Sequence, residues 1–228
     1  MLTDIQFSSA HNDWPALRDA VRRAESEGYD TTWVFAHFDG RTLQGDRDLL
    51  ECFSLLGALA SATTTIGIGP LVANIANRHP AVLAAAAASV DRISAGRLRL
   101  GIGAGAAPGS PWAREHHERG IRLEADVATR HAAVIRQIDA VRAVCDAPVI
   151  IGVNSLALAT IAGTHADGVN VRLTSDGAAA QLDAARSAAG DRPFETSGWA
   201  FVHDDAAQQR AAQWGLDRLV LTSLERLG

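Results

Sequence analysis

The sequence is poor in the residue that forms disulfide bridges and most zinc sites. Only two cysteines occur among its 228 residues, Cys52 and Cys145, and they lie far apart in no metal-ligand spacing. This scarcity argues against a disulfide scaffold and against a zinc site. It is typical of the reducing cytoplasm, so we expect a cytoplasmic protein that holds no metal.

The chain also lacks a basic cluster, a long apolar run and a secretory signal. Lysine and arginine together number 21 against 26 aspartates and glutamates, a formal net charge of -5. That balance argues against a surface for nucleic acid or for an anionic membrane. The most apolar stretch, residues 81–88, is mostly alanine and is far too short to span a bilayer. The N-terminus is polar, with Asp4 and Asp13, unlike a signal peptide.

What the sequence does contain is enough apolar residues for a sizeable core. Hydrophobic residues make up 47% and charged residues 21%, a composition that argues against disorder. Because domains usually span ~100–200 residues, we predict a single domain over residues 1–228.

Short β-rich segments alternate with helical ones along the chain. We expect strands at 2–8, 31–38, 64–72, 97–103, 148–153, 168–173, 194–202 and 218–221. Helices are expected after Asp13 and at 46–62, 80–95, 123–144, 155–165, 176–189 and 204–213, with a long loop at 104–122. Such alternation indicates a parallel sheet, and eight such units build an α/β fold of the (β/α)₈ barrel type. A doubly wound open sheet is the alternative, which the lack of GxGxxG after the first strand disfavours.

Several short motifs occur in a distinctive order. Residues 55–105 contain Ala58–Ala60, Ile66–Gly69, Arg78–Pro80, Asp91–Ser94, Gly96–Arg97 and Gly101–Gly105. Further pieces are Gly28–Asp30 with Trp33 and His37, Pro148–Gly152 with Ala166–Gly168, and Gly215–Asp217 before Leu219–Leu221. The ordered set resembles the luciferase-like superfamily of flavin and coenzyme F420-dependent oxidoreductases. Val72, Asn74 and Arg78–Pro80 look most like the F420-dependent branch, especially methylene-tetrahydromethanopterin reductase.

The resemblance implies a compact (β/α)₈ TIM barrel without the long second-half insertion of many relatives. It places a cofactor across the C-terminal mouth, where barrel active sites lie. The leading hypothesis is an oxidoreductase that moves a hydride between a small-molecule substrate and F420. One alternative is an FMN-dependent oxidoreductase or monooxygenase. Another is a barrel that binds a flavin, or no cofactor, without catalysis.

The resemblance singles out His37 as the catalytic residue. It is expected at the end of the second strand, where relatives carry a proton donor or cofactor contact, and an imidazole exchanges protons near neutral pH. Two carboxylates common in relatives are missing, because Ala36 and Ala106 stand at their positions. Their absence favours the non-catalytic alternative.

Three strand ends are expected to hold the cofactor. At Gly103, Ala104 and Gly105, the two glycines lack side chains and let the backbone approach a ring or phosphate. Gly152, Val153, Asn154 and Ser155 lead into a helix whose N-terminus suits a phosphate, although Asn154 can serve as a plain cap. Leu71 and Val72 fall where F420-dependent relatives have a bulge with a non-prolyl cis peptide, and the resemblance implies that Leu71, Val72, Ala73 and Asn74 contact the cofactor. We expect His37, Val72, Gly105 and Asn154 around one rim.

Other residues receive structural interpretations. The resemblance implies a homodimer that buries Leu49, Phe53 and Leu56 or the alanines at 84–88. His116 and His117 are adjacent and so share no helix face, which predicts a solvated loop rather than a metal pair. Arg99 lies within a strand expected to be covered on both faces, so it needs a partner.

Overall fold

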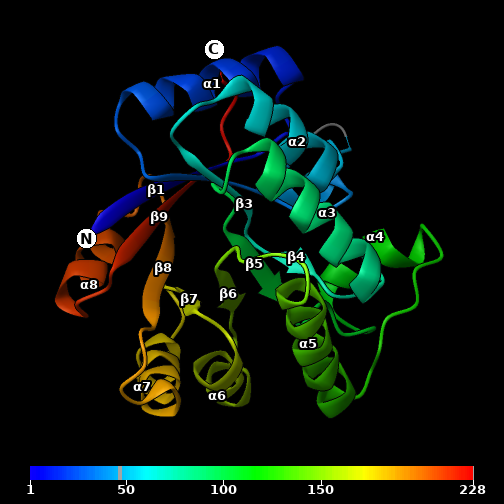
Figure 1. The fold of residues 1–228 in the computed structure, drawn as a ribbon, viewed down its shortest axis with the longest axis vertical. Coiled ribbons are helices and arrows are strands. Elements are labelled where there is room, and N and C mark those ends of the chain that lie inside the picture. The colour runs from blue at the N-terminus through cyan, green and yellow to red at the C-terminus, as the bar shows by residue number, and fades with distance from the viewer. Residues whose placement is uncertain (46–47, 228) are drawn as a thin grey trace.

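Parallel strands curve around a common axis in the computed structural model, which describes residues 1–45 and 48–227 (Figure 1). The described residues form nine strands in the order β3-β2-β1-β9-β8-β7-β6-β5-β4. Their bounds are β1 Leu2–Phe7, β2 Thr31–Val34, β3 Gly67–Pro70, β4 Ala73–Asn74, β5 Leu100–Gly103, β6 Val149–Gly152, β7 Gly168–Arg172, β8 Glu195–Phe201 and β9 Arg218–Ser223.

The two ends of this order are pieces of one barrel strand. Only Leu71 and Val72 separate β3 from β4, and the peptide bond between them is cis. Ile68 of β3 also pairs with Leu98, just before β5, so the sheet closes. The predicted eight-unit barrel is therefore confirmed, with its third strand interrupted where the cis peptide is expected.

Helices cover the outside of the strands, as Figure 1 shows. The longer ones are α1 Trp14–Ser26, α2 Cys52–Ala62, α3 Pro80–Ile93, α5 Val127–Arg142, α6 Leu156–His165, α7 Ala178–Ala189 and α8 Asp205–Gln213. Side-chain caps fix several starts, because an aspartate or serine oxygen satisfies a free N–H of the first turn. Asp13 accepts from Ala16 N at 3.1 Å, and Asp126 accepts from Thr129 N at 2.7 Å.

Two helix starts and one loop differ from expectation. The helix predicted at 46–62 begins at Cys52 because Glu51 caps it; residues 46–47 lie outside the described residues. The helix predicted from 123 begins after its cap Asp126. The loop predicted at 104–122 contains the short helices η2 Pro111–Ala113 and α4 Arg114–His117. A further short helix, η1 Gly40–Leu43, follows β2.

The barrel closes tightly where β3 meets β5. A Cβ on Gly69 would lie 1.9 Å from the carbonyl oxygen of Arg99, and one on Gly101 would lie 2.3 Å from that of Pro70. Only glycine permits this approach. Inside the barrel, apolar side chains from four strand regions meet in one buried cluster: Trp33, Leu71, Ile150 and Val220.

A network of charged side chains lies at the opposite end of the barrel from the strands' C-terminal ends. Arg218 pairs with Asp4 at 2.9 Å, with Glu195 at 2.6 Å and with Asp30. Arg99 pairs with Glu195 at 2.5 Å, so the partner that its position demands is found across the barrel. This network closes the N-terminal end of the barrel and leaves the C-terminal end open.

Candidate active site

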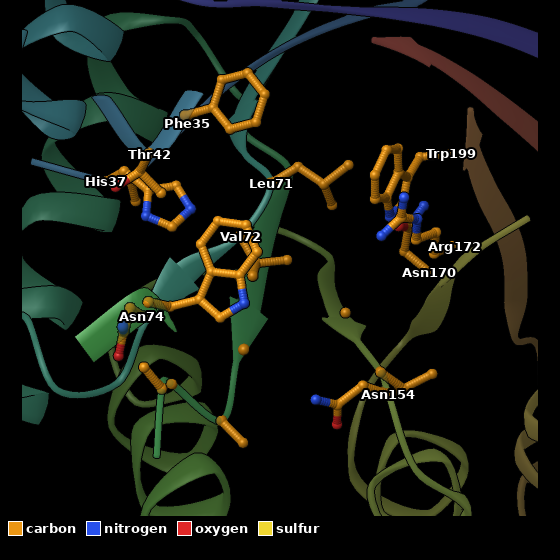
Figure 2. A pocket seen from close by; sticks show the side chains of 18 of the residues that line it. Phe35, His37, Thr42, Leu71, Val72, Asn74, Asn154, Asn170, Arg172 and Trp199 are labelled. Atoms are coloured by element: carbon orange, nitrogen blue, oxygen red, sulfur yellow. The ribbon is translucent and has the colours of Figure 1, made fainter. Parts of the chain in front are cut away.

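A cavity of about 650 Å³ opens at the C-terminal ends of the strands (Figure 2). All the predicted site residues line it except Ala73: His37, Leu71, Val72, Asn74, Gly103, Ala104, Gly105, Gly152, Val153, Asn154 and Ser155. Ala73 is not among the lining residues, because successive side chains of a strand point to opposite faces. Val72 and Asn74 face the cavity, and Ala73 is buried in the core between the strands and helices.

The floor of the cavity forms around Val72. A Cβ on Gly103 would lie 2.6 Å from Val72 Cγ2, and a Cβ on Gly152 would lie 2.7 Å from Val72 Cγ1. Gly103 and Gly152 are also paired in the β5–β6 register. The two glycines therefore leave room for the Val72 side chain, which gives the cavity an apolar base beside the cis peptide.

His37 pairs with a carboxylate that the sequence analysis did not find. Its Nδ1 lies 2.6 Å from Oε1 of Glu115, in α4. The other oxygen, Oε2, accepts from the backbone N–H of Phe38 at 2.7 Å and of Asp39 at 3.0 Å. The Glu115 side chain is 1% exposed, whereas that of His37 is 30% exposed. His37 thus has a carboxylate partner, which comes from α4 and not from the positions of Ala36 and Ala106.

The hydrogen bonds to Glu115 keep it ionised. Burial by itself raises the pKa of this carboxyl, but the hydrogen bond and charge of His37 and the two backbone N–H groups outweigh it. The pKa of Glu115 is consequently lowered from its ordinary value. An ionised carboxylate only accepts hydrogen bonds, so Nδ1 of His37 carries the hydrogen of the shared bond.

His116 is buried, and the predicted solvated loop is wrong for it. It is 1% exposed, and its Nε2 lies 3.0 Å from Asn74 Nδ2 and 2.9 Å from Asn77 Oδ1. Burial lowers its pKa, although Glu115 nearby acts in the opposite direction. His117 is exposed, as predicted. The short helix α4 therefore points His116 inward, where it contacts the side chains of Asn74 and Asn77.

Two features of the cavity lining can receive an anion. Arg130 of α5 donates from Nη1 to the Gly105 carbonyl at 3.2 Å, and its buried Nε has no hydrogen-bond partner among the described residues. Ser155 caps α6 through its Oγ, 3.3 Å from Leu158 N, and α6 directs the positive end of its dipole toward the cap. Asn154 and Ser155 line the same cavity as Arg130.

Aromatic and polar side chains form the wall opposite His37, as Figure 2 shows. Arg172 and Trp199 are paired in the β7–β8 register, and the guanidinium lies 5.2 Å from the indole centroid. Asn170 donates to Ser197 Oγ at 2.9 Å. On the His37 side of the cavity, the Trp112 ring lies tilted against the imidazole, with its centroid 5.8 Å from that of His37.

The described residues offer no site for a metal and no membrane span. No group of three or more histidine, cysteine, aspartate or glutamate side chains within them is placed to hold an ion. None of their helices has the length and apolar character to cross a bilayer.

Comparison with known proteins assigns the family. The sequence model of the luciferase-like monooxygenases matches residues 2–217. The chain belongs to this family. A curated member, 5,10-methylenetetrahydromethanopterin reductase from Methanolobus tindarius, is 28% identical over 222 residues, covering 87% of this chain and 65% of the relative. The Archaeoglobus fulgidus enzyme of that name is 40% identical over 85 residues, 37% of this chain and 23% of the relative.

Solved structures of the luciferase-like family share the fold. An F420-dependent secondary alcohol dehydrogenase superposes with a TM-score of 0.77 at 17% identity, covering 98% of this chain and 94% of its own. The F420-dependent tetrahydromethanopterin reductase from Methanopyrus kandleri gives 0.68 at 17% identity, covering 90% and 67%. This chain spans less than two thirds of the length of the two curated relatives that it matches.

Proposed function

We propose that this luciferase-like protein is an oxidoreductase that moves a hydride between a small-molecule substrate and coenzyme F420. The observation that carries the proposal is one cavity that combines a partly exposed imidazole, an apolar floor and a candidate anion site. The similarity to 5,10-methylenetetrahydromethanopterin reductases over 87% of the chain supports F420 as the cofactor.

The residues present fit a planar cofactor with a phosphate tail. The Val72 side chain, which lies over Gly103 and Gly152, offers an apolar surface for a ring. The unpartnered Nε of Arg130 and the N-terminus of α6 at Ser155 suit the phosphate. An orphaned buried donor is costly in a folded protein, and a phosphate oxygen would satisfy it.

The chemistry divides between cofactor and protein. When bound, F420 supplies the carbon that accepts or donates the hydride. His37 exchanges the accompanying proton through Nε2, because Nδ1 is engaged by Glu115. Trp112 and Phe35 help to exclude water from this side of the cavity, where both line it.

FMN is the second candidate cofactor. FMN also carries a phosphate, so the same anion site fits it. The family includes a luciferase-like monooxygenase from Escherichia coli, 31% identical over 103 residues, 45% of this chain and 29% of that protein. An EDTA monooxygenase superposes with a TM-score of 0.68 at 14% identity over 96% of this chain and 67% of its own.

Arg130→Met is expected to weaken F420 binding about 10–100-fold, since hydrogen bonds to charged groups contribute about 1.5–3 kcal/mol. Isothermal titration of the variant with F420 measures the effect. Arg136→Met is the matched control, because Arg136 is exposed on the same helix and does not line the cavity. Equal affinities for the two variants would remove Arg130 from the proposed phosphate site.

We also propose a cytoplasmic homodimer. Both cysteines are free thiols, as a reducing compartment requires. Of the expected interface, Phe53, Leu56, Ala84 and Ala87 are buried in the chain's own core, whereas Leu49 is half-buried and Ala85 is exposed. The face proposed for the dimer is therefore the exposed side of α3. There Val82 and Ile93 are 55% and 54% exposed.

Light scattering should give a dimer for the wild-type protein and a monomer for the Val82→Glu, Ile93→Glu double variant. Two charges on an apolar interface remove its favourable burial and must be desolvated. A wild-type monomer across a wide range of concentrations would contradict the proposed face and the dimer together.

A further inference from the structure

We propose that Glu115 is the positioning residue of His37: it holds the imidazole in the tautomer with hydrogen on Nδ1 and leaves Nε2 free for substrate protons. The inference rests on the proposed function for the identity of that proton. The geometry that carries it is the 2.6 Å contact between Glu115 Oε1 and His37 Nδ1.

The Glu115 carboxylate is fully engaged and cannot turn away. Oε1 receives the imidazole hydrogen, and Oε2 receives the N–H groups of Phe38 and Asp39. Those two residues directly follow His37, so one carboxylate binds both the ring and the backbone that carries it. At 1% exposure, water does not compete for its oxygens. Such an arrangement fixes both the orientation and the tautomer of a histidine.

The segment that carries Glu115 is itself anchored on two strand ends. His116, the next residue, reaches Asn74 at the end of β4 and Asn77 beyond it. Arg114 donates to Asp39 Oδ2 at 2.9 Å, on the segment after β2. Consecutive residues of α4 therefore bind the ends of two strands, which keeps Glu115 in place over His37.

This geometry defines the path of the proton between the substrate and His37. An O–H or N–H bond of the substrate breaks, its proton forms a bond with His37 Nε2, and the imidazole becomes an imidazolium. Glu115 stays ionised throughout and stabilises the new positive charge through the Nδ1 hydrogen bond, as a carboxylate does for a general-base histidine. In the opposite direction Nε2 returns the proton. No described side chain is hydrogen bonded to Nε2 of His37.

Glu115→Gln tests this role with almost no change in shape. The glutamine carbonyl oxygen still accepts from the N–H groups of Phe38 and Asp39, which turns its amide NH₂ toward His37. An NH₂ group only donates, so Nδ1 must now accept and the hydrogen moves to Nε2. The variant is thus expected to fold normally with the opposite imidazole tautomer.

The tautomer can be read directly by ¹H–¹⁵N multiple-bond NMR on the ¹⁵N-labelled full chain. We expect Nδ1–H in the wild type and Nε2–H in Glu115→Gln. Glu118→Gln is the matched control, because it removes the same charge from the same segment at a side chain that contacts Arg41 instead. This variant should retain the hydrogen on Nδ1 of His37. An Nε2–H tautomer in the wild type overturns the inference without any variant, and so does an unchanged tautomer in Glu115→Gln.

Steady-state kinetics provides the second readout. In an F420-dependent assay, Glu115→Gln should lower kcat about 100-fold or more with little change in KM, because the wrong tautomer offers no lone pair to the proton. Glu118→Gln should match the wild type, and a wild-type kcat in Glu115→Gln overturns the inference. If the wild type binds neither F420 nor FMN, the proposed function fails while the NMR result still decides the role of Glu115.

Discussion

The His37→Ala variant should turn over about 10²–10⁴-fold more slowly than the wild type, the usual contribution of a general acid or base. Among the described residues, Glu115 cannot replace Nε2 of His37, because it is held by backbone N–H groups and stays ionised. His116 is buried and hydrogen bonded elsewhere. Cofactor affinity should change much less, since the proposed phosphate contacts are Arg130 and Ser155 rather than His37.

Titrating cofactor into His37→Ala and then assaying at saturation separates the two effects. His117→Ala is the control, because that imidazole is exposed, two residues from Glu115, and is not part of the cavity. Unchanged turnover in a folded His37→Ala variant would remove His37 from the mechanism. Lost binding with normal turnover at saturation would make it a cofactor contact.

The second large effect concerns stability. Arg218→Met is expected to lower the free energy of unfolding by about 3–5 kcal/mol, the cost of leaving a buried carboxylate without its partner. Asp4 is fully buried and lies 2.9 Å from the guanidinium, whose side chain is 7% exposed. Glu195 retains Arg99 as a partner, so Asp4 bears most of the loss. Urea denaturation measures it, with exposed Arg22→Met as a control expected within about 0.5 kcal/mol of wild type.

The Arg218→Met defect should depend on pH. Burial raises the pKa of Asp4 to about 6 in the folded protein, although Arg218 and the Trp33 hydrogen bond lower it in part. A raised carboxyl pKa means that the folded state binds the proton more tightly, so this group's contribution to stability is present in acid and is lost as pH rises through the folded pKa. Without Arg218 the pKa rises further. The defect should therefore be smaller near pH ~5 than near pH ~8, and the same defect at both would contradict this account.

The barrel was predictable because local patterns and global fold agree in this chain. Each β-rich segment has one side against helices and one inside the barrel, and glycine occurs where β3 and β5 approach closely. His37, Val72, Gly105 and Asn154 meet at one cavity because parallel strands place their C-terminal ends on one rim. Ala73, expected with its neighbours as a cofactor contact, places its side chain in the core instead of the cavity.

Glu115 was not predictable from the sequence. It lies in a stretch dense in charge, which is typical of a solvated segment, and its neighbours His117 and Glu118 are indeed exposed. Its burial depends on backbone N–H groups more than seventy residues earlier in the chain. The missing acids at Ala36 and Ala106 were the available signal. A lone histidine at the mouth called for a partner, but local spacing could not identify which carboxylate supplies it.

The most direct test of the central claim is a titration of the purified wild-type protein with F420 and, separately, with FMN, following affinity and the spectrum of the bound cofactor. The cavity, its anion site and the family relationship predict saturable binding of F420 with a spectral shift, tighter than that of FMN. Preferential binding of FMN would instead support the flavin-dependent alternative. Binding of neither cofactor would contradict the account and favour a barrel without catalysis.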